Sequence, residues 1–217
     1  MDYSENSGYT AGDYSMGKDK SLPVCTVALV GINAVVFLTG LLLPGVGRWM
    51  EMQGQFSVAY LIYGGDIYRL VTAAFLHVDI EHLLNNMLLL YCCGEIVERS
   101  LGRCRFLILY FLSAVCGNLL SAAYELSIGG YYNSIGASGA VFGLTGALLF
   151  LVIVKRGAAA HISLRRALIA VALSLYAGFS SAYVNNAAHV GGLLSGFLLA
   201  FLLSIIPPLF SLQIKSQ

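Results

Sequence analysis

The sequence predicts an all-α membrane protein, and three observations lead to this fold class. Of the 217 residues, 58% are hydrophobic and only 11% are charged, whereas a soluble domain has about 25% charged residues. Apolar runs long enough to cross a bilayer recur along the chain, and in lipid such runs form helices because their backbone groups must bond internally. The basic residues gather in alternate connections between these runs.

The chain begins with a polar segment that leads into the first predicted helix. Residues 1–22 are rich in Ser, Gly, Tyr and Asp and lack hydrophobic periodicity, which is typical of a disordered tail. The apolar run at residues 23–43 is too long for a signal-peptide core, and no small-residue cleavage site follows it. We therefore expect a retained membrane anchor.

Five further apolar stretches predict five more membrane-spanning helices. The second and the fifth of the six contain the fewest strictly apolar residues. The six helices would form one domain over residues 23–207, followed by a cytoplasmic tail at residues 208–217. The five stretches lie at about residues 83–94 with an upstream extension of mixed polarity, 106–123, 135–154, 168–179 with its flanks, and 187–206.

The placement of Lys and Arg predicts the orientation in the membrane. With six spans, ten of the twelve basic residues share one side, and only Arg48 and Arg69, in the long first loop, lie on the other. Because basic residues mark the cytoplasmic side, we expect a multi-pass protein of the cell (plasma) membrane with both termini in the cytoplasm. The ten are Lys18, Lys20, Arg99, Arg103, Arg105, Lys155, Arg156, Arg165, Arg166 and Lys215.

Three polar residues are predicted to lie at one depth in this arrangement. His82, Ser138 and His189 lie near the beginnings of the second, fourth and sixth helices, which run inward from the outer face. They precede the inner ends of these helices by 16, 17 and 18 residues, or roughly 24–27 Å. In a hydrocarbon core about 30 Å thick, all three lie just below the outer surface.

The motif Gly136-Ala137-Ser138-Gly139 opens the fourth predicted helix. Small residues at this place can simply let helices approach, and a serine can bond its own helical turn. However, Ser138 lies in the first turns, where free N–H groups and the positive end of the helix dipole stabilise an anion. The flanking glycines also leave room for a substrate backbone. These features suit acyl transfer.

The motif Ala188-His189-Val190-Gly191-Gly192 opens the sixth predicted helix. A lone histidine in such a helix is more often a packing or relay residue. Glycines four residues apart, however, give the fourth and sixth helices flat faces that can pack closely. This packing would bring His189 within hydrogen-bond distance of Ser138, about 2.6–3.2 Å, as a base for its hydroxyl. We assign helix packing to Gly136, Gly139, Gly143, Gly192 and Gly196.

His82 and Asn86 are four residues apart and share one face of the second predicted helix. An imidazole and a side-chain amide can donate hydrogen bonds to a developing oxyanion. For Asn86 alone, hydrogen bonding between helices is an equally good interpretation. We assign no chemistry to Asn85 or His77, and because no acidic residue is well placed to orient His189, we expect a dyad rather than a triad.

These motifs, taken in order, resemble those of the rhomboid intramembrane serine proteases. The resemblance extends from the first helix to the end of the sixth and includes Tyr68-Arg69-Leu70, Glu98 and Gly102. The motifs that carry it are His82-x-x-x-Asn86, Gly136-x-Ser138-Gly139 and Ala188-His189-x-x-Gly192-x-x-x-Gly196.

The resemblance implies a bacterial-type rhomboid bundle of six transmembrane helices with a first loop, at about residues 44–71, embedded partly in the outer leaflet. It implies that Ser138 is the nucleophile, that His189 is the general base, and that His82, Asn86 and the Ser138 N–H form the oxyanion hole. The implied substrates are single-pass transmembrane proteins cleaved near the outer face, where the site opens. The fifth helix would be the lateral gate. Phe142 stands where many members have a Tyr that stacks on the catalytic His, and Tyr68 replaces the usual Trp.

Other classes of function fit less well. A non-catalytic rhomboid-like protein that binds membrane clients is the principal alternative, and loss of the serine or histidine would indicate it; both are present. A transporter would show ionisable residues at the midplane or an inverted repeat. The four histidines have no clustered carboxylates or thiolates beside them and form no His-Glu-x-x-His motif, which argues against a metal site, and no basic cluster suggests nucleic acid. We therefore expect transmembrane substrates and the lipid bilayer as partners, with no cofactor, metal or nucleic acid.

Overall fold

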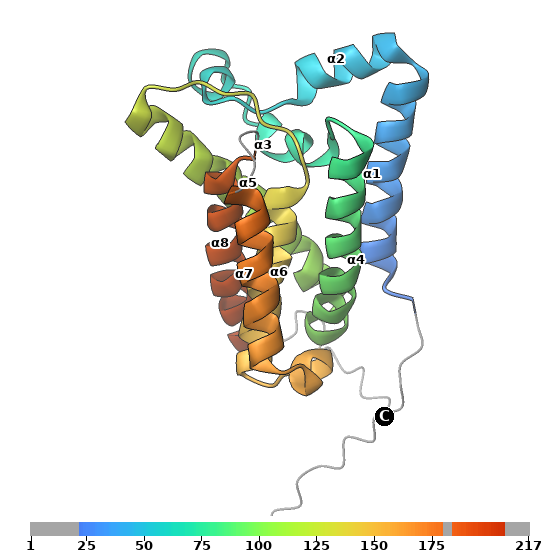
Figure 1. Ribbon diagram of the computed structural model, residues 1–217, viewed down its shortest axis with the longest axis vertical. Coiled ribbons are helices and arrows are strands. Elements are labelled where there is room, and N and C mark those ends of the chain that lie inside the picture. Colours follow the sequence, from blue (N-terminus) through green and yellow to red (C-terminus); the bar gives the residue numbers. More distant parts are fainter. Residues whose placement is uncertain (1–21, 180–183, 207–217) are drawn as a thin grey trace, which may run out of the picture.

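The computed structural model describes residues 22–179 and 184–206, so the expected tails, except residue 22, lie outside the described residues. Within them, long helices form a single bundle, with the connection after α1 folded over one end (Figure 1). The long helices are α1 (Val24–Leu42), α4 (Ile80–Leu101), α5 (Arg103–Ile128), α6 (Ser138–Ile153), α7 (Leu164–Phe179) and α8 (Asn186–Ile205).

These helices confirm the predicted all-α membrane fold. Each of the six apolar stretches coincides with one long helix. Three of them, α1, α5 and α8, are long and apolar enough to cross a membrane by themselves, and α6 is a shorter apolar helix. That all six helices span the bilayer remains a prediction.

Two helices begin at residues that the hydropathy pattern does not mark. The Asp79 side chain accepts a hydrogen bond from the His82 N–H at 2.7 Å, and this N-cap starts α4 at Ile80, ahead of its apolar run. α6 begins at Ser138 rather than at residue 135. Gly136 has a φ of +134°, which L side chains rarely adopt, so the chain turns there before it enters the helix.

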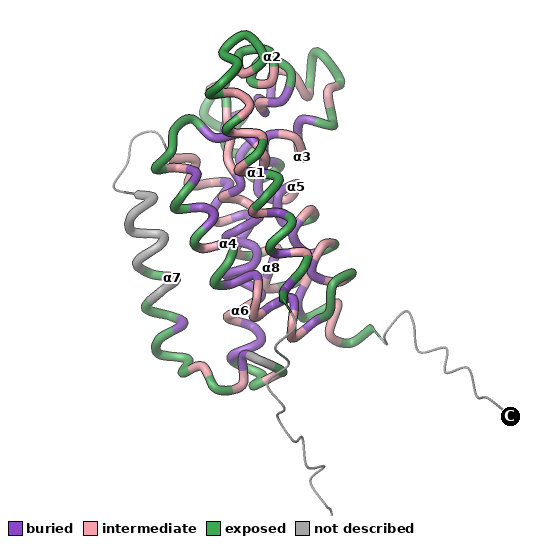
Figure 2. Tube along the Cα trace, turned by 90° about the vertical axis from the view of Figure 1, so that its right-hand side faces the viewer, coloured by how far each residue is buried: buried purple, intermediate pink, exposed green. Residues whose placement is uncertain are grey.

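The helix α6 lies at the centre of the bundle core. This helix packs most extensively against α8 and also contacts α4, α5 and α7. Figure 2 shows the buried segments concentrated in the interior along α4, α6 and α8. Because α6 has neighbours on nearly every side, apolar residues are buried all around it, as in other fully enclosed helices.

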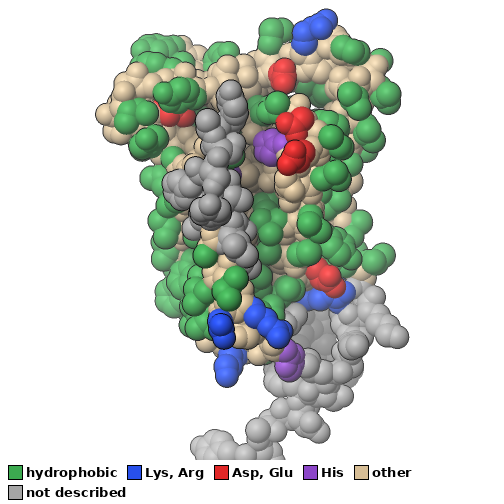
Figure 3. Space-filling model, in the orientation of Figure 1, with side chains coloured by type: hydrophobic (Ala, Val, Ile, Leu, Met, Phe, Trp, Pro, Cys, Tyr) green, Lys and Arg blue, Asp and Glu red, His purple; other side chains and the backbone are tan. Residues whose placement is uncertain are grey.

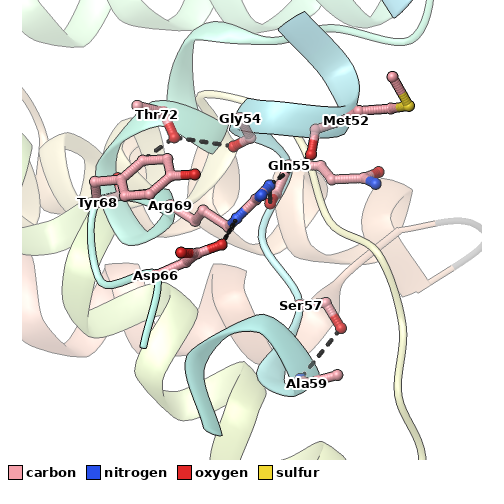
Figure 4. Close-up of polar contacts among 9 residues, drawn as sticks. All are labelled: Met52, Gly54, Gln55, Ser57, Ala59, Asp66, Tyr68, Arg69 and Thr72. Carbon is pink, nitrogen blue, oxygen red and sulfur yellow. Dashed lines mark hydrogen bonds and ion pairs between the residues drawn. The ribbon is translucent and has the colours of Figure 1, made fainter. Parts of the chain in front are cut away.

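The first loop folds around one buried arginine (Figure 4). It contains α2 (Pro44–Gly54) and the short helix α3 (Arg69–Thr72). The Arg69 guanidinium donates to the carbonyl oxygens of Met52 and Gln55 at 2.8 and 3.1 Å and to the Asp66 carboxylate at 2.8 Å. Its charge also lies 4.2 Å from the Tyr60 ring centre. One cation therefore provides hydrogen bonds to backbone carbonyls that have no partner within a helix or a strand.

The first loop is joined to the segment that precedes α6. Phe56 and Ser134 form an isolated antiparallel bridge, in which the Phe56 N–H donates to the Ser134 carbonyl at 2.9 Å and the Ser134 N–H donates back at 2.7 Å. The Gly136 N–H donates to the Ala73 carbonyl at 2.9 Å. These bonds fix the path of the chain into Ser138.

The opposite end of the bundle is held by a buried carboxylate. Glu98 of α4, 4% exposed, accepts hydrogen bonds from the N–H groups of Cys25 and Thr26 at 3.0 and 2.8 Å and from the Thr26 hydroxyl at 2.7 Å. These donors lie in the first turn of α1, whose N-cap residue, Pro23, provides no side-chain cap. Glu98 therefore replaces that cap from another helix, at the favourable end of the α1 dipole.

The two ends of the bundle differ in charge. On the face shown in Figure 3, hydrophobic side chains cover much of the flank, and most Lys and Arg side chains gather at the end opposite α2. This distribution agrees with the asymmetry on which the predicted orientation depends.

We expect Glu98→Gln to lower the free energy of unfolding by about 1.5–3 kcal/mol, because an amide carries no charge and has one oxygen to accept three hydrogen bonds. Denaturation in detergent micelles measures this change. Glu95→Gln is the matched control: Glu95 pairs with Arg99 on a partly exposed side of the same helix, and loss of this ion pair should cost less than about 1 kcal/mol. Equal losses in the two variants would contradict the capping role.

Candidate active site

Ser138 lies at the beginning of α6, at the end of the bundle where the first loop lies. Its side chain is half-buried. The first N–H groups of a helix have no acceptor within their own helix, so the N–H of Ser138 is available as a donor beside its hydroxyl. The turn at Gly136 and the hydrogen bond from its N–H to the Ala73 carbonyl fix where this helix begins.

Gly136 brings the imidazole of His82 next to Ser138. A Cβ atom on Gly136 would lie 2.8 Å from His82 Nε2 and 3.7 Å from Ser138 Oγ. His82 on α4 and Ser138 on α6 therefore border the same small volume. Only glycine provides both the backbone conformation and the space that this contact needs.

Asn86 lies one turn further along α4, on the same face as His82. Its side chain is 7% exposed, and within the described part of the chain its Nδ2 group has no hydrogen-bond partner. A buried amide donor without a partner costs about 1–3 kcal/mol. Such a donor is available to an oxygen atom that enters the site.

His189 lies in the first turn of α8 and is 7% exposed. The Phe142 ring of α6 stacks on it, with 4.2 Å between ring centres and 14° between planes. Ser138 and His189 make no hydrogen bond with each other in the described residues, and His189 Nδ1 has no partner there. Catalytic hydrogen bonds are often long before substrate binds. The expected bond from Ser138 to His189 therefore stays a prediction.

The glycines assigned to helix packing have unequal surroundings. A Cβ on Gly192 or Gly196 would collide with the carbonyl oxygen of Gly139 or Gly143. A Cβ on Gly143 would collide with the Ser113 side chain. At Gly139 it would have only ordinary contacts, the nearest at 3.8 Å. Gly139 therefore contributes to the contact between α6 and α8 through its backbone carbonyl, against which Gly192 of α8 packs.

Several residues around this site were not predicted. Gly117 of α5 lies against the α6–α8 contact, since a Cβ there would be 2.8 Å from the Ala188 carbonyl. Asn185 is the N-cap of α8, and its Oδ1 accepts from the Ala188 N–H at 3.0 Å. An Asn just before an apolar helix is a recognisable cap signal. No sequence pattern indicates the hydrogen bonds of Asn185 to Ser121 and Ser134.

His77, to which no chemistry was assigned, lies beside the site. Its ring meets the His82 ring edge-on, with 5.1 Å between centres. His77 is 8% exposed, and neither ring nitrogen has a hydrogen-bond partner among the residues described. Burial, and secondarily the nearby His82, lower its pKa to about 4. His77 is therefore neutral at pH 7.

Comparison with known proteins gives a consistent result. The family model described as "Rhomboid domain" matches residues 64–206. The chain is 35% identical to the rhomboid protease GluP of Bacillus subtilis over 145 residues, which are 67% of this chain and 28% of GluP. It is 36% identical to RHOMBOID-like protein 1 of Arabidopsis thaliana over 160 residues, which are 73% of this chain and 40% of that protein.

A third relative matches over most of both chains. YdcA of Bacillus subtilis, which also carries the rhomboid name, is 32% identical over 181 residues, 83% of this chain and 88% of YdcA. The matched part thus covers less than half the length of GluP and of RHOMBOID-like protein 1, and most of YdcA.

We expect acidification to destabilise the protein partly through His77. Because its folded pKa of about 4 lies below the ordinary value near 6.5, the unfolded chain binds a proton in this range that the folded protein does not. The stability linked to His77 is therefore complete above pH 6.5 and is lost as the pH falls toward 4, by up to about 1.4 kcal/mol per pH unit. His77→Phe should flatten the decrease of the unfolding midpoint between pH 6.5 and 4.5. Parallel curves for parent and variant would contradict this.

Proposed function

The chain belongs to the rhomboid family, and from this premise we propose that it is an intramembrane serine endopeptidase with Ser138 as nucleophile and His189 as general base. One observation carries the proposal. The nucleophile candidate at the start of α6 lies beside His82 across Gly136, while α8 brings His189 to the same helix through glycine contacts. In this proposal, the starts of α6 and α8 and one face of α4 would bring a hydroxyl, a base and hydrogen-bond donors to one site.

In the proposed reaction, Ser138 Oγ attacks the carbonyl carbon of the scissile bond while His189 accepts the hydroxyl proton. The negative charge that develops on the carbonyl oxygen accepts hydrogen bonds from His82, the Asn86 amide and the Ser138 N–H. The C–N bond then breaks, and His189 passes its proton to the leaving amine. Water then attacks the acyl carbon and gives a proton to His189. The bond between that carbon and Ser138 Oγ breaks, and His189 returns the proton to Oγ.

Packing would orient the base in this dyad. Phe142 stacks on the His189 ring at 4.2 Å and restricts its rotation, although it lacks the hydroxyl of a tyrosine. No Asp or Glu carboxylate bonds to His189 in the part of the chain that the structure describes. This arrangement supports a Ser–His dyad in which an aromatic ring takes over the orienting role that a carboxylate has in a triad.

The substrates would be single-pass transmembrane proteins that reach the site from the bilayer. The basic residues favour cytoplasmic termini, so the site would open on the outer side. The proposed lateral gate is α7, whose described part lies at the edge of the bundle in Figure 2 and, among the residues described, packs less extensively against α6 than α8 does. A helix with few contacts can move at lower cost.

We expect Ser138→Ala to reduce cleavage of a transmembrane reporter in liposomes by at least about 10³-fold, because the nucleophilic oxygen is removed. It should also abolish labelling by a fluorophosphonate probe. Ser195→Ala is the matched control, since the Ser195 hydroxyl donates to a carbonyl within α8, and its activity should equal that of the parent. A folded parent that is never labelled would favour the alternative of a non-catalytic protein that binds membrane clients.

We expect Asn86→Ala to lower kcat by about 10²-fold with little change in KM, since an oxyanion donor acts mainly in the transition state. Asn85→Ala is the control, because Asn85 is the adjacent residue on α4 and its side chain is exposed. Steady-state kinetics on the same reporter measure both. If the two variants are equally active, Asn86 has no part in the oxyanion hole.

A further inference from the structure

One amide side chain connects the segment that leads to Ser138 with the helix that carries His189. Asn185 donates both hydrogens of its Nδ2 group, to Ser121 Oγ at 2.7 Å and to Ser134 Oγ at 3.1 Å. Its Oδ1 accepts from the Ala188 N–H at 3.0 Å. The side chain thus contacts α5, the connection between α5 and α6, and the first turn of α8.

Both partners of the Asn185–Ser134 contact are close to the proposed dyad. Ser134 precedes Ser138 by four residues, and its backbone is bonded in both directions to Phe56. Asn185 precedes His189 by four residues, and the His189 N–H donates to the Asn185 carbonyl at 3.2 Å. A shift of either segment along this contact therefore changes the separation of nucleophile and base.

A buried carboxylate sets the direction of the hydrogen bonds. Glu125, 3% exposed, accepts from the Ser121 hydroxyl at 2.9 Å and from the Tyr132 N–H at 3.1 Å. Because the Ser121 hydroxyl has one hydrogen and gives it to Glu125, it offers a lone pair to Asn185. The amide must then direct its N–H groups to the two serines and its oxygen to α8.

We propose that Asn185 is a positioning residue for the Ser138–His189 pair, because it holds the connection before α6 against the first turn of α8. The inference rests on the proposed function of that pair. The glycine contacts determine the distance between the axes of α6 and α8. The Asn185 contacts determine the position of their first turns relative to each other along the bundle axis. Misplacement of a reacting group by about 1 Å can cost about 10² in rate.

Two variants separate this role from simple helix capping. Asn185→Asp keeps an oxygen for the Ala188 N–H, which is a good N-cap, but has no hydrogen to donate to Ser134 or Ser121. Ser134→Ala removes one acceptor and leaves the α8 cap and Glu125 unchanged. Ser134→Thr keeps the hydroxyl and is the rescue variant, and Asn133→Ala, an exposed neighbour in the same connection, is the control.

The experiment measures kcat and KM on the transmembrane reporter in liposomes, fluorophosphonate labelling rate, and the thermal unfolding midpoint. We expect Asn185→Asp and Ser134→Ala each to lower kcat and labelling about tenfold or more, with KM near the parental value. The double variant should be no worse than the more impaired single one, because both changes break the same contact. Ser134→Thr and Asn133→Ala should retain parental kcat, and the unfolding midpoint of Ser134→Ala should stay close to that of the parent.

Three outcomes would overturn the inference. Parental kcat in Ser134→Ala and Asn185→Asp refutes it while the proposed function stands. A loss of kcat that only follows the loss of unfolding midpoint across the variants shows a structural role instead. A parent that neither cleaves nor labels, equal to Ser138→Ala, refutes the proposed function and this inference together.

Discussion

The contact between α6 and α8 is the constraint on which the rest of the structure depends. In a bilayer, apolar side chains gain little by leaving lipid for a neighbouring helix, so association relies on close packing and hydrogen bonds. The two helices approach until no side chain fits at Gly192 or Gly196. Since backbone atoms form the contact, side-chain rotation cannot change it. It brings the helix starts that carry Ser138 and His189 together.

Buried polar groups complete this packing where the backbone is irregular or where a helix begins. Arg69 pairs the carbonyl groups of the first loop, and Glu98 pairs the N–H groups of α1. Both ions have several partners, as burial of a charge requires. By contrast, Asn86 Nδ2 and His189 Nδ1 are buried without a partner among the described residues. In the proposed enzyme the Asn86 donor would find its partner in the substrate.

Hydropathy and motifs predicted much of this arrangement but misplaced several details. The six apolar stretches coincide with the long helices, and the spacing of His82 and Asn86 placed both on one face. The start of α6 was predicted three residues early, because residue 135 is apolar and hydropathy does not register the turn at Gly136. Gly139 and Gly192 look equivalent in the sequence, yet only Gly192 lies where a Cβ would collide. Steric need depends on the rotation of each helix, which composition does not reveal.

The sequence by itself determined the class of protein, the helical stretches and the side chains available for chemistry, since these follow from local apolar length, turn residues and short motifs. The tertiary structure decided which of these residues meet. Asn185 is 64 residues from Ser121 and 51 from Ser134, and yet one amide bonds both. Such contacts depend on the rotation and level of helices packed against one another. The rotation of each helix and its position along the bundle axis are set by the close packing of backbones and side chains. The order of residues along one helix does not reveal that packing directly.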